Sequence, residues 1–263
     1  MIRAFFNLKD LPFAKNICKD LLFASASFAE ANKRLDYIKD NRGIFLLTGD
    51  PGVGKTTLVR SFLANLSSNY EAFYIPLATV SVFDFYHQLN TYLHKDFCHR
   101  KSALFASIQD AIKNLVTNRK VVPILIFDEA HLLKPDNFYE LQLILNFDQD
   151  STTPAIVILI GQSHLRDKLA RSILVSFNQR ITLKYHLIPL NKQETCNFIA
   201  HAMKIVGGSD ALFSSQALEA VFNNSQGNIR LITKIASKSL FAAAYSNNSL
   251  VSEEHVFAAT SEI

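Results

Sequence analysis

The sequence predicts an α/β fold in which a five-stranded parallel sheet is covered by helices and followed by a purely helical domain. Two observations carry this prediction. As far as residue 188, short apolar segments with the length of buried strands alternate with amphipathic helical segments. After that residue, only helical segments follow. Because strands that alternate with helices form parallel sheets with both faces covered, we expect an α/β domain at 1–188 and a helical lid at 189–263.

The composition is that of a globular chain. Hydrophobic residues make up 49% and charged residues 19% of the 263 residues, enough apolar material for a sizeable core. No apolar run approaches the roughly 18–20 residues that a membrane helix needs, and the N-terminus is charged too early for a signal peptide. Three widely spaced cysteines favour a reducing compartment, so we expect a cytoplasmic protein without disulfides or a cysteine metal site. The net charge of +4 permits nucleic-acid binding without requiring it.

The individual elements follow from periodicity and from turn signals. A lead-in at residues 1–43 contains one predicted helix at 26–39. The predicted strands lie at 44–48, 72–77, 122–127, 155–160 and 181–186, with helices between them at 57–66, 82–93, 103–116 and 135–147. The predicted lid helices lie at 191–206, 214–223, 229–245 and 252–260. Asn191 and Ser214 stand where N-caps belong, and Gly207-Gly208 ends the first lid helix.

Residues 49–56, Gly-Asp-Pro-Gly-Val-Gly-Lys-Thr, fit the phosphate-binding loop pattern of a glycine, four residues and then Gly-Lys-Thr. The strand at 44–48 and the helix at 57–66 flank this loop, which is the arrangement that aims a helix N-terminus at phosphate. The glycines let successive backbone N–H groups point at phosphate oxygens. Lys55 adds a charge at the β- and γ-phosphates, and the Thr56 hydroxyl is a Mg²⁺ ligand. The expected nucleotide contacts in the loop are Gly49, Asp50, Pro51, Gly52, Val53, Gly54, Lys55, Thr56 and Thr57.

A second motif lies at the end of the predicted strand 122–127, where the apolar run stops at Asp128-Glu129. The acid at this strand tip of a phosphate-loop fold holds Mg²⁺, often through water, and we assign this role to Asp128. A second acid directly after it can polarise the attacking water, so Glu129 is the candidate general base. A protein that only senses nucleotide does not need the second acid, so we expect ATP hydrolysis with Mg²⁺.

The strand, phosphate loop, Asp-Glu tip and helical lid together resemble the AAA+ ATPases, a family of P-loop NTPases. Further segments resemble the ExeA-like branch of this family, and the similarity runs from about Phe6 to Ala244. These segments are Phe6–Leu8 with Pro12-Phe13, Leu46–Gly49, Asp128–Leu133, Asn146–Asp148, Leu159–Gln162, Leu165–Leu169 and Gln179–Ile181.

The resemblance implies two further polar positions in the α/β domain. A polar residue after the fourth strand contacts the γ-phosphate or the water in AAA+ proteins, and Gln162 matches it best, with Ser163 as the alternative. An arginine just before the fifth strand reaches into the site of the next subunit. Arg180 fits that position, with Arg171 as the runner-up. The guanidinium of Arg180 can neutralise charge that develops on the transferred phosphoryl group.

The resemblance also implies contacts from outside the α/β core. Gly227-Asn228-Ile229-Arg230 is similar to the Gly-x-x-Arg sensor at the start of a lid helix, in which Arg230 reaches the γ-phosphate. Pro12 and Phe13 of the lead-in correspond to a wall of the adenine site, although plain core packing explains Phe13 equally well.

ExeA-like relatives fall into two functional groups. One group serves secretion, with the ATPase attached to a membrane helix and a cell-wall-binding domain; the other accompanies transposases as free-standing ATPases that polymerise on DNA. The chain carries no expected membrane helix, and Tyr74–Ser81 with Phe83–Tyr86 are similar to the transposase-associated group. The resemblance therefore implies a self-assembling regulator that binds double-stranded DNA with ATP, recruits or activates a transposase, and leaves on hydrolysis. It also implies an ATPase that is slow and dependent on assembly, in a ring or a helical filament.

Loops after the second strand face the central channel of AAA+ assemblies, and hydroxyl and basic residues suit contacts with phosphates. The expected DNA contacts, sequence-independent and salt-sensitive, are Thr79, Ser81, Lys95, Arg100, Lys101, Arg119 and Lys120. Solvated loop charges explain each of these residues about equally well. Two other hypotheses stand beside the DNA regulator: a secretion-type ATPase that acts on a protein or cell-envelope partner, and a nucleotide-sensing assembly module with negligible turnover.

Overall fold

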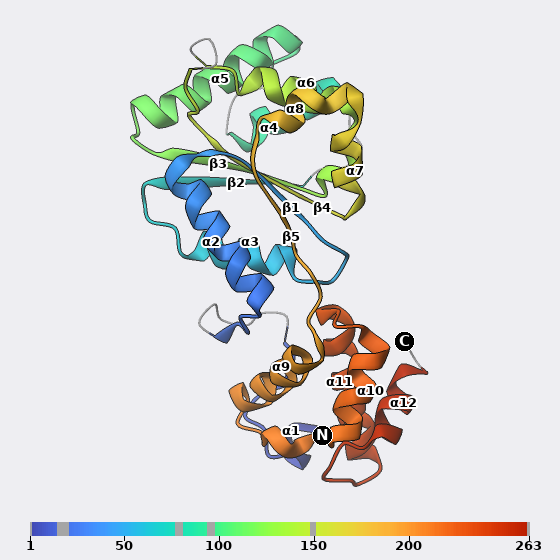
Figure 1. The fold of residues 1–263 in the computed structure, drawn as a ribbon. Coiled ribbons are helices and arrows are strands. Elements are labelled where there is room, and N and C mark those ends of the chain that lie inside the picture. The colour runs from blue at the N-terminus through green and yellow to red at the C-terminus, as the bar shows by residue number, and fades with distance from the viewer. Residues whose placement is uncertain (1, 15–20, 77–80, 94–97, 148–150, 262–263) are drawn as a thin grey trace. The chain divides into compact units, whose positions relative to one another are not determined.

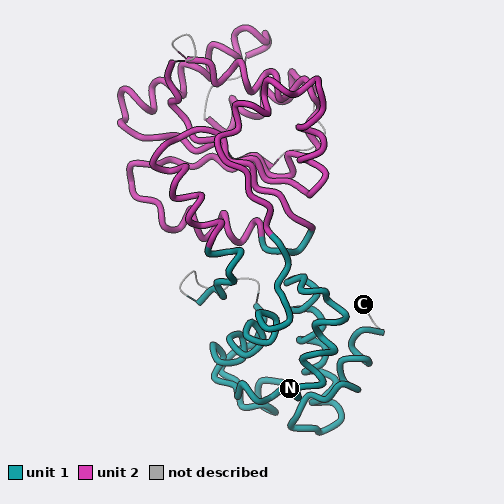
Figure 2. Tube along the Cα trace, viewed as in Figure 1, with its two compact units in different colours: residues 1–29, 51–54, 188–263 teal, residues 30–50, 55–187 magenta. Residues whose placement is uncertain are grey.

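The computed structural model describes residues 2–14, 21–76, 81–93, 98–147 and 151–261 (Figure 1). The chain divides into two compact units (Figure 2). The α/β unit contains residues 30–50 and 55–187, and the helical unit contains residues 1–29, 51–54 and 188–263. Among the described residues, no helix is long and apolar enough to cross a bilayer.

The α/β unit is built on a five-stranded sheet, and all four strand pairings are parallel. The spatial order of the strands is β2-β3-β4-β1-β5. Their bounds are β1 Gly43–Thr48, β2 Tyr70–Pro76, β3 Val122–Asp128, β4 Ile156–Gly161 and β5 Ile181–His186. The predicted α/β fold with five parallel strands is therefore confirmed.

Burial along the strands explains why the sequence revealed them. Every residue of the central strand β4 is buried, and five of six in β1 are, so these strands read as continuous apolar runs. The edge strands β2 and β5 are only partly buried. Helices cover both faces of the sheet, with α2 and α3 on one face and α4, α5, α6 and α8 on the other (Figure 1).

The helices of the α/β unit lie close to their predicted places, and two short ones, α7 and α8, are additional there. α7 and α8 span only seven and five residues, too few for a helical period to be recognised in sequence. The helices are α2 Ala26–Asn41, α3 Lys55–Ala64, α4 Val82–Tyr92, α5 Lys101–Thr117, α6 Pro135–Ile144, α7 His164–Ala170 and α8 Val175–Gln179, with 3₁₀ turns η2 Ala130–Leu132 and η4 Ser172–Leu174.

The helical unit contains the four predicted helices of the lid and its own core. Both predicted N-caps are present: the Asn191 side chain accepts from the Glu194 N–H in a reciprocal capping box, and Ser214 accepts from the Ala217 N–H. The elements are α1 Ile2–Phe5, α9 Lys192–Ile205, the 3₁₀ turn η5 Asp210–Leu212, α10 Ser215–Ser225, α11 Ile229–Tyr245 and α12 Glu253–Thr260.

The lead-in groups differently from the predicted domain 1–188, because residues 1–29 belong to the helical unit. Ile2 and Leu8 are buried in the hydrophobic core that the lid helices form. The Lys9 N–H also donates to the Val206 carbonyl at 2.8 Å. The apolar side chains of the lead-in thus complete the core of the lid. Sequence periodicity cannot reveal such packing between distant segments.

A glycine fixes the entry to α11. Gly227 has a φ of +76°, and a Cβ added there would lie 1.8 Å from the Leu190 carbonyl oxygen. The same two residues are joined by a bond from the Leu190 N–H to the Gly227 carbonyl, 2.9 Å long. Because the obstacle is backbone, it cannot move aside. We expect Gly227→Ala to lower the free energy of unfolding by about 3 kcal/mol or more, measured by urea denaturation.

Gly207→Ala is the matched control for this prediction. Gly207 has a φ of +75°, but a Cβ there would meet only the flexible Lys9 side chain, 3.3 Å away. The control therefore carries the left-handed strain alone and should cost about 1–2 kcal/mol. Equal losses in the two variants would contradict the role of the Leu190 contact.

Candidate nucleotide-binding site

The predicted phosphate loop, the Asp-Glu motif and the polar residue after β4 emerge at one edge of the sheet. β4 lies between β3 and β1, and all of them are parallel, so their carboxyl ends are adjacent. Thr48 pairs with Gly161, and Phe127 with Leu159. Ligands of open α/β sheets bind at this edge. The structure therefore brings Lys55, Asp128 and Gln162 to the same place.

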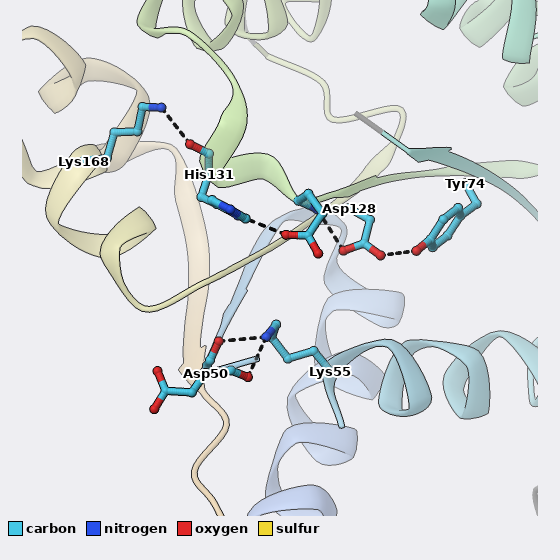
Figure 3. A network of polar contacts seen from close by, with 8 residues as sticks. Asp50, Lys55, Tyr74, Asp128, His131 and Lys168 are labelled. Atoms are coloured by element: carbon cyan, nitrogen blue, oxygen red, sulfur yellow. Dashed lines mark hydrogen bonds and ion pairs between the residues drawn. The ribbon is translucent and has the colours of Figure 1, made fainter. Parts of the chain in front are cut away.

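The loop has the backbone conformation that its glycines predict. Gly52 and Gly54 have φ values of +90° and +104°, which L side chains rarely adopt. Lys55 begins α3, and its Nζ donates to the carbonyls of Gly49 and Asp50 at 2.7 and 2.9 Å (Figure 3). The first N–H groups of a helix have no partner within it, so the start of α3 offers donors to an anion.

Asp128 ends β3 and is held by two donors. Its Oδ1 accepts from the Glu129 N–H at 2.8 Å, and its Oδ2 accepts from the Tyr74 hydroxyl of β2 (Figure 3). Burial, followed by the bond to Asp128, raises the pKa of Tyr74 well above its usual range, so the hydroxyl stays protonated and donates. Tyr74 was not among the predicted site residues. The signal was its place near the carboxyl end of the strand that pairs with β3.

Glu129 follows in a left-handed conformation, with φ 52° and ψ 34°. Its side chain is 53% exposed, and Oε2 lies 3.3 Å from Nδ1 of the buried His131, without the geometry of a hydrogen bond. Burial lowers the pKa of His131, although the charge of Glu129 opposes this shift, so the imidazole is neutral near pH 7. The His131 ring also meets His164 edge-on, with centroids 4.7 Å apart. Glu129 is therefore an accessible carboxylate beside a neutral ring.

The loop after β4 is tied to the phosphate loop. The Ser163 hydroxyl donates to Asp50 Oδ1 at 2.5 Å. Gln162 precedes it, directly after the last residue of β4, and its carbonyl accepts from the Leu165 N–H at 3.0 Å. Ser163 thus has a structural partner in the loop, whereas Gln162 lies at the strand end where the predicted contact belongs.

Arg180 lies at the opposite end of the sheet, where the amino ends of the strands are. It lines a cavity together with residues at the amino ends of three strands, among them Gly43, Ala155 and Thr182. Six-residue strands at roughly 3.3 Å per residue separate this edge from the phosphate loop by about 16–20 Å. An arginine side chain cannot bridge that distance. Arg171, the alternative, is exposed at the C-cap of α7.

Arg230 lies in the first turn of α11, and the helical unit contains both this turn and residues 51–54 of the loop. The Asn228 side chain donates to the Pro51 carbonyl at 2.6 Å, and the Arg230 N–H donates to the Gly52 carbonyl at 3.2 Å. A Cβ on Gly52 would lie 2.4 Å from Asn228 Oδ1. The middle of the phosphate loop is therefore packed against the start of α11.

Phe13 also belongs to the helical unit. Its ring lies 6.3 Å from that of Phe198 in α9, and it packs partly buried against the core of the unit. This contact favours the alternative of core packing for Phe13 over a wall of the adenine site.

Two of the basic residues predicted to contact DNA form ion pairs with acids. Lys101 Nζ lies 2.6 Å from Glu140 Oε1 and above the Tyr86 ring. Arg119 contacts Glu71 Oε2 at 2.7 Å. Both acids reduce the positive charge that these residues offer to a phosphate.

The remaining predicted DNA contacts are placed as follows. The Ser81 hydroxyl caps α4 by accepting from the Asp84 N–H, and it donates to the Asp84 carboxylate. Arg100 and Lys120 are exposed, at the residue before α5 and in a left-handed turn before β3. Thr79 and Lys95 lie outside the described residues.

The donor set fits a nucleoside triphosphate with Mg²⁺. Lys55 and the start of α3 supply positive charge and N–H donors for phosphate oxygens. Thr56, at the start of α3, and Asp128, at the tip of β3, would supply the hard oxygen ligands that Mg²⁺ takes when phosphates and water complete its shell.

Comparisons with known proteins show the family and the fold of the chain. The model of the family described as "AAA domain" matches residues 38–169, just over half of the chain. General secretion pathway protein A from Aeromonas hydrophila is 32% identical over 247 residues, which cover 92% of this chain and 45% of that protein. The chain thus spans less than half the length of this relative.

Several solved structures share the fold. Cdc6p from Pyrobaculum aerophilum has a TM-score of 0.71 at 17% identity, covering 99% of this chain and 71% of that chain. ORC2 from Aeropyrum pernix, in ADPNP–ADP complexes, has a TM-score of 0.71 at 16% identity, covering 95% and 71%. Drosophila ORC bound to DNA has a TM-score of 0.66 at 18% identity, covering 99% and 64%. These structures show the shared fold, and the match of the AAA domain to just over half of the chain shows that the chain belongs to the AAA+ ATPase family.

Proposed function

We propose that this chain hydrolyses ATP at the carboxyl edge of its sheet and that ATP controls its self-assembly on DNA. The observation that carries the ATPase proposal is the placement of three residues at the carboxyl ends of parallel strands. Lys55 ends the loop that follows β1, and Asp128 and Glu129 lie at the end of β3, with only β4 between the two strands. Lys55 binds the β- and γ-phosphates, and Thr56 and Asp128 hold the Mg²⁺, which neutralises charge on the phosphates.

Glu129 is the general base in this proposal. Its carboxylate is accessible and lies directly after Asp128, so it can orient a water molecule and accept its proton. Gln162 extends from the adjacent strand end and contacts the γ-phosphate or that water. We favour Gln162 over Ser163 because the Ser163 hydroxyl is already bonded to Asp50.

Arg180 completes the site of a neighbouring subunit. Its place at the amino edge of the sheet removes it from the phosphate loop of its own chain. A second copy that presents its amino edge to the carboxyl edge of the first would bring the guanidinium to the phosphates. The active unit is then an interface between two copies, and hydrolysis depends on assembly.

Arg230 reports the nucleotide state to the helical unit. Because its N–H bonds the Gly52 carbonyl and Asn228 bonds Pro51, a change in the loop on phosphate binding acts directly on the first turn of α11. The Arg230 side chain adds a second link by contacting the γ-phosphate.

The assembled chains bind duplex DNA and recruit or activate a transposase, and hydrolysis releases them. The DNA-binding part of this proposal is supported by the net charge of +4 and by the shared fold with Drosophila ORC bound to DNA. The transposase is proposed only from the resemblance of Tyr74–Ser81 and Phe83–Tyr86 to the transposase-associated group. A secretion role is the second candidate, favoured by the 32% identity to general secretion pathway protein A. In that role the partner of the ATP-bound assembly is a protein or a cell-envelope component.

Filter binding of duplex DNA separates the two candidates. We expect retention with ATP but not with ADP, and a loss of affinity as salt rises, because basic residues that neutralise phosphates release counterions. Changing Arg100 and Lys120 together to Ala should weaken retention equally for different DNA sequences. Lys113→Ala, on the exposed side of α5, is the control of equal charge type. Absence of retention at low salt with ATP would contradict the DNA proposal.

A further inference from the structure

A lysine of α7 forms hydrogen bonds with the 3₁₀ turn that directly follows Glu129, the proposed base. Lys168 Nζ donates to the His131 carbonyl at 2.8 Å (Figure 3). It also donates to the Leu133 carbonyl. The His131 carbonyl belongs to the 3₁₀ turn η2 and the Leu133 carbonyl to the residue directly after it, where backbone acceptors lack partners within the turn. The Lys168 side chain is partly buried, and this burial lowers its pKa. Because one partly buried ammonium group donates to two carbonyls of this short segment, it holds the turn against α7.

The turn in question is directly joined to Glu129. The Glu129 carbonyl accepts from the Leu132 N–H at 2.9 Å, and the Ala130 carbonyl accepts from the Leu133 N–H at 3.2 Å. Glu129 itself is held in the left-handed conformation, which a non-glycine residue adopts only when its surroundings impose it. A shift of the carbonyls that Lys168 holds would therefore move the backbone of Glu129.

The helix that carries Lys168 begins close to Gln162, the residue that directly follows β4. α7 begins two residues after Gln162, and the Leu165 N–H donates to the Gln162 carbonyl at 3.0 Å. Gly161 lies against the same turn, since a Cβ there would be 3.4 Å from the His131 nitrogen. The segments that carry Gln162 and Glu129 are therefore packed together, and Lys168 adds side-chain bonds from α7 to the turn after Glu129.

We infer that Lys168 is a positioning residue for hydrolysis, which holds the turn after Glu129 against α7 so that the base and Gln162 keep a fixed separation. This inference rests on the proposed role of Glu129. Neither Lys168 nor its two carbonyl partners touches the nucleotide in this scheme. Its loss should consequently affect turnover rather than the affinity for ATP.

Lys168→Met tests the inference, because methionine keeps the unbranched stem and removes the donor. With protein concentrations that saturate assembly, we expect kcat to fall by about 10- to 100-fold, since small misplacements of a catalytic group cost this much. The equilibrium constant for ATP binding should stay within about twofold, since the phosphate-loop contacts remain. Lys168→Arg, which retains N–H donors, should recover part of the lost kcat. Lys113→Met, on the exposed side of α5, is the control.

A double variant distinguishes positioning from a general loss of structure. If Lys168 acts through Glu129, adding Lys168→Met to Glu129→Gln should not lower the residual rate further, because coupled residues are non-additive. A parent kcat in Lys168→Met, with Glu129→Gln inactive, would overturn this inference alone. A matched fall in kcat, ATP affinity and melting temperature would assign Lys168 a purely structural role and also overturn it. A parent rate in Glu129→Gln would overturn the proposed base and the inference with it.

Discussion

Glu129→Gln should bind ATP with the affinity of the parent protein and lose turnover. Glutamine keeps the shape of the side chain, and the N–H of residue 129 can still donate to Asp128, so the Mg²⁺ ligand stays in place. An amide cannot accept the proton of the attacking water. We expect kcat to fall by about 100-fold or more, because general base catalysis contributes about 10²–10⁴-fold. Phosphate release at saturating ATP and equilibrium binding of labelled ATP are the two measurements.

Two controls define the meaning of this result. Glu253→Gln, on the exposed side of α12, makes the same chemical change away from the site and should behave as the parent protein. Lys55→Ala should lose ATP affinity, since it removes the charge at the β- and γ-phosphates. Turnover at the parent rate in Glu129→Gln would show that another group activates the water. A loss of ATP binding would assign Glu129 to the binding of the nucleotide instead.

The parts of the site that the sequence predicts are those set by contiguous residues. The loop 49–56 carries its own glycines, and the strand before it and the helix after it are recognised by their apolar patterns. Asp128 and Glu129 are predicted from the acidic end of the apolar run 122–127, the strand tip that holds Mg²⁺ in a phosphate-loop fold. The strand order β3-β4-β1 is the structural reason why this strand tip lies at the same edge of the sheet as the loop.

Contacts between segments that are far apart in the sequence could not be predicted from the sequence alone. Tyr74 reaches Asp128 from a separate strand, and Lys168 reaches the turn after Glu129 from a helix too short to show a period. Each contact depends on strand register and on rotamers rather than on local pattern. The charges considered for DNA binding illustrate the same limit. Arg119 finds its acidic partner, Glu71, on a neighbouring strand, and composition cannot show this pairing.

Arg180→Ala should abolish the rise of ATPase rate per subunit that assembly of the parent protein produces. The residue lies at the amino ends of the strands, roughly 16–20 Å from the phosphate loop of its own chain, so in the proposed role it can reach a nucleotide only across an interface. An arginine supplied by a neighbouring subunit contributes about 10³-fold or more to kcat. We expect the rate per subunit to climb with protein concentration in the parent and to stay low and flat in the variant. Arg171→Ala tests the alternative arginine in the same assay.

Mixing two inactive variants gives the sharper test of shared sites. An Arg180→Ala subunit keeps its own phosphate loop, and a Lys55→Ala subunit keeps its own Arg180. If each site is built from two copies, the mixture should regain activity that neither variant has alone, because some interfaces then pair an intact loop with an intact arginine. A rate per subunit that is flat with concentration in the parent protein, together with no recovery on mixing, would mean that each chain hydrolyses ATP by itself. In that case the place of Arg180 at the far edge of the sheet would exclude it from the reaction.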